Sequence, residues 1–224
     1  GFTLFRGRAD YGAGAYIEAG SLRNSRLLSN IADYYGGGIY FHGAGGNVQQ
    51  CVIHSNVAWY GGGIEFDGGG SAAHCEITDN TALDSGGGAD CWGGGFLGHC
   101  TILRNSSAYY GGGVECWEGG VLNNCIIMNN EATYDGGGIE SSYWVVGATV
   151  SNSLIVANTA GRYGGGVDLW GGGDLVNCTI VGNTGLLGGG LHGDGGLVQN
   201  SIVYYNNAPN GPNFLDEGGG VVFA

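Results

Sequence analysis

Apolar and polar residues recur along the chain with one long period. Glycine triplets begin at residues 36, 61, 86, 111, 136, 164 and 188, and a shorter copy, GAG, begins at residue 12. Successive copies lie 24 to 28 residues apart, and the longest interval holds an insertion around residues 143–146. A fixed period in this range is typical of solenoid proteins. We therefore expect one repeated unit throughout residues 1–224, which then form a single domain.

Within each repeat the apolar positions alternate with polar ones, which is the period of a β-strand, and glycine interrupts every window in which a helix could form. Two apolar columns follow each glycine triplet, and we expect their side chains to point inward. The first column is Ala15, Ile39, Ile64, Ala89, Val114, Ile139, Val167 and Leu191. The second is Ile17, Phe41, Phe66, Cys91, Cys116, Ser141, Leu169 and Gly193.

The next strand of each repeat supplies further inward columns, such as Leu27, Ile53, Ile77, Ile102, Ile127, Ile155, Ile180 and Val203. The pattern predicts an all-β fold, a parallel β-solenoid of about eight coils with roughly 25 residues per coil. Coils stack about 4.8 Å apart, and glycine suits their corners because it adopts positive φ at little cost. Residues 206–224 end in a new glycine triplet and are expected to form a final irregular coil.

The repeat resembles those of right-handed parallel β-helix proteins of the pectate-lyase-like superfamily. It is most similar to the glycine-rich repeats of chlamydial polymorphic outer-membrane proteins and related bacterial surface proteins. The matching motifs are a glycine triplet followed by an aliphatic residue, as at 36–39 and 61–64, and a segment that ends in asparagine, as at 51–56. The chlamydial repeat carries Phe where this chain mostly has Cys. The resemblance implies a right-handed β-helix at an extracellular or cell-surface location, and it leaves function open because this fold hosts lyases, hydrolases, adhesins and spacers.

An asparagine closes the second strand of every repeat. Side-chain amides both donate and accept hydrogen bonds, so stacked asparagines are expected to bond to one another and to the turn backbone as a structural ladder. The column is Asn30, Asn56, Asn80, Asn105, Asn130, Asn158, Asn183 and Asn206.

Cysteines also fall on successive coils. Cα atoms about 4.8 Å apart lie within the range that a disulfide can bridge. The candidate disulfides are Cys51–Cys75, Cys100–Cys125 and Cys91–Cys116, which leave Cys178 free. In-register side chains point the same way and would strain such a bond, so buried thiols that pack as small hydrophobic groups are the alternative. Zinc is not expected, because the spacing is the repeat period and no histidines converge on it.

The charge balance narrows the classes of partner. The chain has 19 acidic and 6 basic residues, for a net charge of −13. Nucleic acid is not an expected partner, because phosphate binding needs clusters of Lys and Arg. Membrane insertion is not expected either, because no apolar run approaches about 20 residues.

One face of the predicted rod combines acids with aromatic residues. We expect the residue after each inward aliphatic position to face solvent, and many of these residues are acidic. The candidate ligand face consists of Glu65, Asp90, Glu115, Glu140, Asp168, Trp92, Trp117, Trp170, Tyr60 and Tyr110. Carboxylates about 4.8 Å apart repel by roughly 0.9 kcal/mol per pair even in water, so they should hold protons or collect cations such as Ca²⁺. The face could equally bind glycans or serve as a solubilising surface, and no cofactor is required.

Catalysis on this face is an alternative. Glycoside hydrolysis needs two carboxyl groups at a defined separation. The candidates are Asp67, Asp90, Glu115, Glu140 and Asp168, with Arg162 as a basic partner. The repeat offers many equivalent pairs, whereas an active site normally breaks a repeat. A polysaccharide lyase or glycoside hydrolase is therefore the second choice, behind a structural protein without catalytic residues.

The outward positions of the second strand are apolar in the later repeats. They are Leu103, Ile126, Met128, Leu154, Val156, Val181, Ile202 and Tyr204. An exposed apolar stripe of this size is typical of an interface. We therefore expect the rods to associate end to end or laterally, as the subunits of a fibre or surface rod, with an adhesin module as the alternative.

Overall fold

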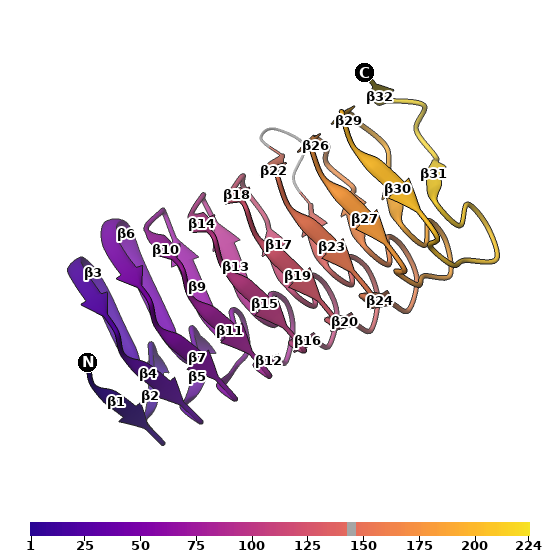
Figure 1. The fold of residues 1–224 in the computed structure, drawn as a ribbon. Helices are drawn as coiled ribbons and strands as arrows, with labels where there is room; N and C mark the ends of the chain where they lie inside the picture. The colour runs from indigo at the N-terminus through magenta and orange to yellow at the C-terminus, as the bar shows by residue number, and fades with distance from the viewer. Residues whose placement is uncertain (143–146) are drawn as a thin grey trace.

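The computed structural model describes residues 1–142 and 147–224, so the insertion at residues 143–146 lies outside the described residues. The described chain consists of short strands joined by tight turns, and it contains no helix. Each strand pairs in parallel with the equivalent strand of the next coil. The coils stack from the N-terminus to the C-terminus into one elongated solenoid (Figure 1). The predicted β-solenoid is confirmed.

The first sheet has nine strands, one from each coil. They are β1 (Thr3–Phe5), β4 (Arg26–Leu28), β7 (Val52–His54), β11 (Glu76–Thr78), β15 (Thr101–Leu103), β19 (Ile126–Met128), β23 (Leu154–Val156), β27 (Thr179–Val181) and β30 (Ile202–Tyr204). The solenoid thus has about nine turns, in agreement with the predicted count of about eight.

The second sheet begins directly after the asparagine column and has seven strands, five of which contain only two residues. They are β2 (Arg8–Tyr11), β5 (Ile31–Tyr35), β8 (Val57–Ala58), β12 (Thr81–Ala82), β16 (Ser106–Ser107), β20 (Glu131–Ala132) and β24 (Thr159–Ala160). The glycine triplets come after this sheet and form the corner that leads into the third one.

The third sheet has two rows of strands, which are joined by the long strands β3 (Ala15–Arg23) and β6 (Ile39–Gln49). The row after the glycine corner is β9 (Ile64–Asp67), β13 (Ala89–Trp92), β17 (Val114–Cys116), β21 (Ile139–Ser141), β25 (Val167–Leu169), β28 (Leu191–Gly193) and β31 (Phe214–Asp216). The other row is β10 (Ser71–Ala73), β14 (Phe96–Gly98), β18 (Val121–Asn123), β22 (Ala148–Ser151), β26 (Gly173–Val176), β29 (Gly196–Gln199) and β32 (Val221–Phe223). Strands β31 and β32 show that residues 206–224 extend the stack.

The apolar columns form one continuous core. Ile39 pairs with Ile64 in the next coil, Val114 pairs with Ile139, and all four side chains are fully buried. Each aliphatic side chain therefore packs against its equivalents in the coils above and below. The predicted inward columns are confirmed.

The asparagine column is a buried row of hydrogen-bonded amides. Asn105 is typical: its Nδ2 donates to the carbonyl of Ile77 at 2.9 Å and to Oδ1 of Asn130 at 3.0 Å. Its Oδ1 accepts from both the backbone N–H and the side-chain amide of Asn80. The same pattern recurs from Asn56 to Asn206, so the row fastens one corner along most of the solenoid.

The corners use glycine for two reasons. Gly61, which opens a triplet, has a φ of 58°, in the left-handed region that glycine adopts most readily. Gly87, in the middle of a triplet, has no room for a side chain, since a Cβ would lie 2.4 Å from the carbonyl oxygen of Gly112. The other corners are built without glycine triplets, and residues such as His74 and Asp79 adopt φ values of 54° and 57° there.

All seven cysteines are buried free thiols. The Sγ of Cys100, for example, donates to the carbonyl of Gly98 at 3.3 Å. None of the candidate disulfides is formed, and the thiols occupy the core as small hydrophobic groups, the alternative that the sequence left open.

Candidate functional site

The acids that the sequence predicted to face solvent are buried, so this part of the predicted ligand face is wrong. We call them the acid row: Glu65, Asp90, Glu115, Glu140 and Asp168. Their exposed fractions are between 0 and 3%. Consecutive members are register partners on neighbouring strands, so the carboxyl groups form a line that follows the axis of the solenoid.

The cause of this burial is the glycine corner. These side chains leave the sheet on its outer side, as the alternation predicts, but the preceding turn bends over them. A Cβ on Gly61 would lie 2.7 Å from Oε2 of Glu65, and a Cβ on Gly136 would lie 2.7 Å from Oε2 of Glu140. The corner glycine therefore rests directly against the carboxyl group and shields it from water.

Burial changes the protonation of the acid row. It raises the pKa of Asp90 to about 7, and the nearby charge of Asp84 adds to the effect. Burial also raises the pKa values of Glu65, Glu115 and Glu140 well above the usual glutamate range, with a further contribution from neighbouring carboxylates of the row. Desolvation favours the neutral acid, so each member of the row keeps its proton to a higher pH than an exposed carboxyl group would.

The C-terminal end of the row meets a buried histidine. Nδ1 of His192 lies 2.7 Å from Oδ1 of Asp168, and both side chains are at most 2% exposed. Burial raises the pKa of Asp168 to about 6, although its hydrogen bond with His192 acts in the opposite direction. Desolvation lowers the pKa of His192, but the hydrogen bond and charge of Asp168 outweigh it, so the net shift is upward.

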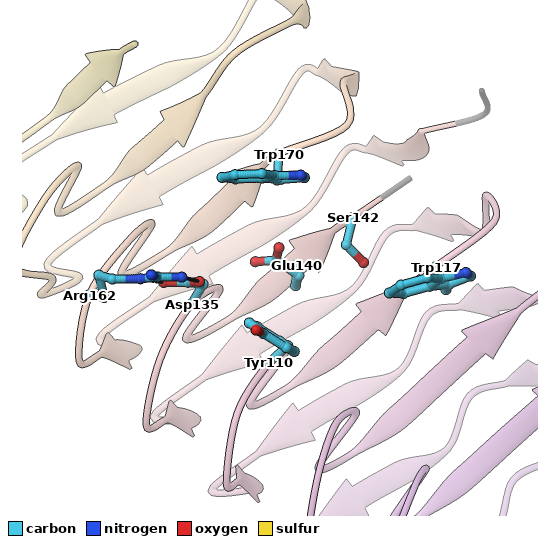
Figure 2. Close-up of a pocket in the computed structure, with 7 residues that line it drawn as sticks. All are labelled: Tyr110, Trp117, Asp135, Glu140, Ser142, Arg162 and Trp170. Atoms are coloured by element: carbon cyan, nitrogen blue, oxygen red, sulfur yellow. Dashed lines mark hydrogen bonds and ion pairs between the residues drawn. The ribbon is translucent and has the colours of Figure 1, made fainter. Parts of the chain in front are cut away.

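A pocket of about 460 Å³ opens beside the acid row. Its lining comes from three consecutive coils and consists of Tyr110, Trp117, Asp135, Glu140, Ser142, Arg162 and Trp170. Figure 2 shows the indole rings of Trp117 and Trp170 on one side, the Arg162–Asp135 pair on the other, and Glu140 between them. The indoles follow β17 and β25, while Tyr110, Asp135 and Arg162 belong to the glycine corners.

An ion pair fixes one wall of this pocket. Nε of Arg162 donates to Oδ1 of Asp135 at 2.9 Å, and its Nη2 contacts Oδ2. Asp135 also accepts from the backbone N–H of Tyr163 at 3.0 Å. The hydrogen bond to Asp135 raises the pKa of Arg162, so this cation stays charged and is neutralised locally.

Two pocket residues were absent from the sequence prediction. Asp135 occupies a column that holds tyrosine at residues 35, 60, 110 and 163, so its departure from the repeat was the available signal. Ser142 stands where neighbouring coils have tryptophan, and its hydroxyl donates to Oε1 of Glu115. The tyrosine column also departs at Ser85 and Leu187, so only the combination of Asp135 and Ser142 in one coil distinguishes this place in the repeat.

The remaining predicted residues lie along the rod without converging on one centre. Trp92 stacks on Trp117 with ring centroids 5.6 Å apart, and both rings are partly exposed. Tyr60 is half-buried beside Glu65 in an earlier coil. Asp67 accepts a hydrogen bond from the hydroxyl of Tyr40 at 2.5 Å. The pocket thus gathers only Glu140 and Arg162 from the candidate catalytic set.

Neither a metal centre nor a membrane span is found in the part of the chain that the structure describes. No group of three or more His, Cys, Asp or Glu side chains there has the arrangement needed to hold a metal ion. No helix there has the length and hydropathy to cross a bilayer. The cation expected on the ligand face stays a prediction.

Comparison with known proteins yields one match. A family model described as a right handed beta helix region matches residues 11–185, which are more than three quarters of the chain. No curated protein and no solved structure matches the chain significantly. The match supplies the handedness of the solenoid, and the specific likeness to chlamydial proteins stays a prediction.

Proposed function

This chain belongs to the right-handed β-helix family, and we propose that it is an extracellular structural β-helix that binds a neutral glycan at the pocket beside Glu140. The observation that carries the proposal is the pocket itself, where two indoles, a tyrosine and several polar groups meet at a break in the repeat. Concave sites with apolar walls and a few converging polar groups are the usual places for small ligands.

The chemistry of the lining favours an uncharged sugar. Aromatic rings offer flat apolar surfaces to the C–H faces of a sugar ring, while Ser142, Tyr110 and Glu140 offer hydrogen-bonding groups to its hydroxyls. Burial raises the pKa of Glu140 and so favours its neutral form, and Arg162 is paired with Asp135. The pocket therefore presents little net charge, although the whole chain is strongly acidic.

Binding to soluble neutral polysaccharides, measured by calorimetry, tests this proposal. We expect saturable binding that weakens at least about tenfold in Trp170→Ala, consistent with a loss of 1.4 kcal/mol or more. Trp59→Ala is the matched control, because Trp59 is similarly exposed but lies outside the pocket. Absence of binding across a panel of neutral glycans, or equal losses in both variants, would refute the proposal. Release of shortened sugars would favour the enzymatic alternative.

We also propose that the rods associate laterally through the first sheet. The predicted apolar stripe lies on its outer side, and Ile126, Leu154, Ile202 and Tyr204 are between 37 and 61% exposed. Light scattering should show a mass that grows with concentration in the wild type and stays that of a monomer in Ile126→Ser/Leu154→Ser. A wild-type monomer at every concentration would contradict this part of the proposal.

A further inference from the structure

We propose that the acid row is a proton-binding site whose occupancy controls the stability of the β-helix, so that the solenoid weakens as protons are released on going from acidic to alkaline pH. The proton is the ligand, and the five carboxyl groups are its site. This inference is independent of glycan binding.

The first support is the geometry of the row. Glu65, Asp90, Glu115 and Glu140 lie on four consecutive strands, and each is the register partner of the next. Strands in a sheet are about 4.8 Å apart, so neighbouring carboxyl groups lie close enough to interact strongly in a medium of low dielectric. Two ionised neighbours would repel, whereas a neutral acid beside a carboxylate does not.

The second support is the set of buried oxygens that lack partners. Among the described residues, one carboxyl oxygen of every member of the acid row is buried without a hydrogen-bond partner: Glu65 Oε2, Asp90 Oδ1, Glu115 Oε2, Glu140 Oε2 and Asp168 Oδ2. When such a carboxyl group is ionised, the unpartnered oxygen has lost its hydration with no hydrogen bond to replace it, which is a cost to the folded state. Protonation removes the charge and supplies an O–H donor, so it relieves the cost in the simplest way.

The third support is the charge around the row. The acids that face it from neighbouring elements are Asp67, Asp84, Asp135, Asp194 and, through His192, Glu217. The neutral titratable groups that face it are Tyr35, Tyr40, Tyr60, Tyr110, Cys91 and Cys116. The positive groups are Arg162 and His192.

These surroundings leave the row short of counter-charge. Arg162 lowers the pKa of Glu140 slightly, but its guanidinium is already bound to Asp135. His192 reaches only Asp168, at the C-terminal end of the row. The central members, Asp90 and Glu115, are therefore neutralised by bound protons and not by cationic side chains.

The direction of the pH effect follows from linkage. Unfolded carboxyl groups ionise near pH 4, while those of the folded row keep their protons to higher pH, to about 7 for Asp90 and about 6 for Asp168. The folded state thus binds more protons than the unfolded state in this window. The free energy that the protonated row adds to folding is fully present below about pH 4. It is lost as the pH rises through the pKa values that these groups have in the folded state. Ion-paired acids such as Asp79, whose pKa Arg104 lowers, act in the opposite direction.

Infrared spectroscopy and thermal unfolding together test the inference. The wild type should show the absorption of protonated carboxyl groups at pH 7, and that band should disappear reversibly at alkaline pH. This measurement needs no variant, so it stands even if a substitution prevents folding. The melting temperature should fall by roughly 5 °C or more between pH 5 and pH 8.

Glu115→Gln, an uncharged side chain of similar shape, should reduce both the infrared band and the dependence of the melting temperature on pH. Glu131→Gln is the matched control, because Glu131 is exposed on β20. It should leave both readouts unchanged. Absence of the band at pH 7, or a melting temperature that is constant or higher at pH 8, would overturn the inference. Equal responses in the two variants would do the same.

Discussion

Replacing Asn105 by alanine tests whether the asparagine row holds the solenoid together. The substitution removes two donated hydrogen bonds, to Ile77 and Asn130, and two accepted bonds from Asn80. The backbone N–H of Asn80, which is completely buried, then loses the side-chain acceptor that it uses at 2.9 Å. We expect a large loss of stability from a single truncated amide.

The magnitude can be worked from these contacts. Each intramolecular hydrogen bond contributes about 0.5–1.5 kcal/mol, so the loss of four amounts to about 2–6 kcal/mol. The value should lie within this range rather than above it, because Nδ2 of Asn80 still donates to Ile53 and Oδ1 of Asn130 still accepts from the backbone N–H of residue 105. For a chain of this length the loss corresponds to a fall of roughly 10 °C in melting temperature.

Urea unfolding followed by circular dichroism measures the effect, with Asn210→Ala as the control. Asn210 is an exposed asparagine in the C-terminal coil. Its truncation should change the free energy of unfolding by less than about 0.5 kcal/mol. A loss below about 1 kcal/mol in Asn105→Ala would refute the reasoning, because it would mean that the buried amides contribute no more than surface groups.

Two further predictions concern the corners and the thiols. Gly87→Ala should prevent folding or severely destabilise the protein, because the new Cβ would lie 2.4 Å from the backbone oxygen of Gly112. Gly195→Ala should be tolerated, because its Cβ would meet nothing nearer than 3.8 Å. Equal stabilities of the two purified variants would contradict this prediction. All seven cysteines should resist a thiol reagent in the native protein and react fully after denaturation without reductant, because they are buried and free. Fewer than seven reactive thiols in the denatured protein would show that some of the candidate disulfides form.

Much of the fold followed from the repeat. In a parallel stack, a period of about 25 residues places equal positions above one another, so the alignment of the glycine triplets alone fixes the register. That is why the rows of Ile39 and Ile64, and of Asn56 and Asn80, were evident from the sequence, and why their pairing appears in the structure as expected.

The chemistry of the site was decided by the tertiary structure. The alternation of side chains along a strand predicts which face of the sheet the Glu140 side chain points from. Only the direction of the corner at Gly136 decides whether that side chain meets water or the preceding turn. The same corner brings Asp135 and Arg162, 27 residues apart, into contact and leaves a pocket beside the indoles. The sequence by itself determined which residues share a row, because register depends on spacing alone. Which rows are exposed depends on how the turns fold back over the sheets, and spacing carries no information about that.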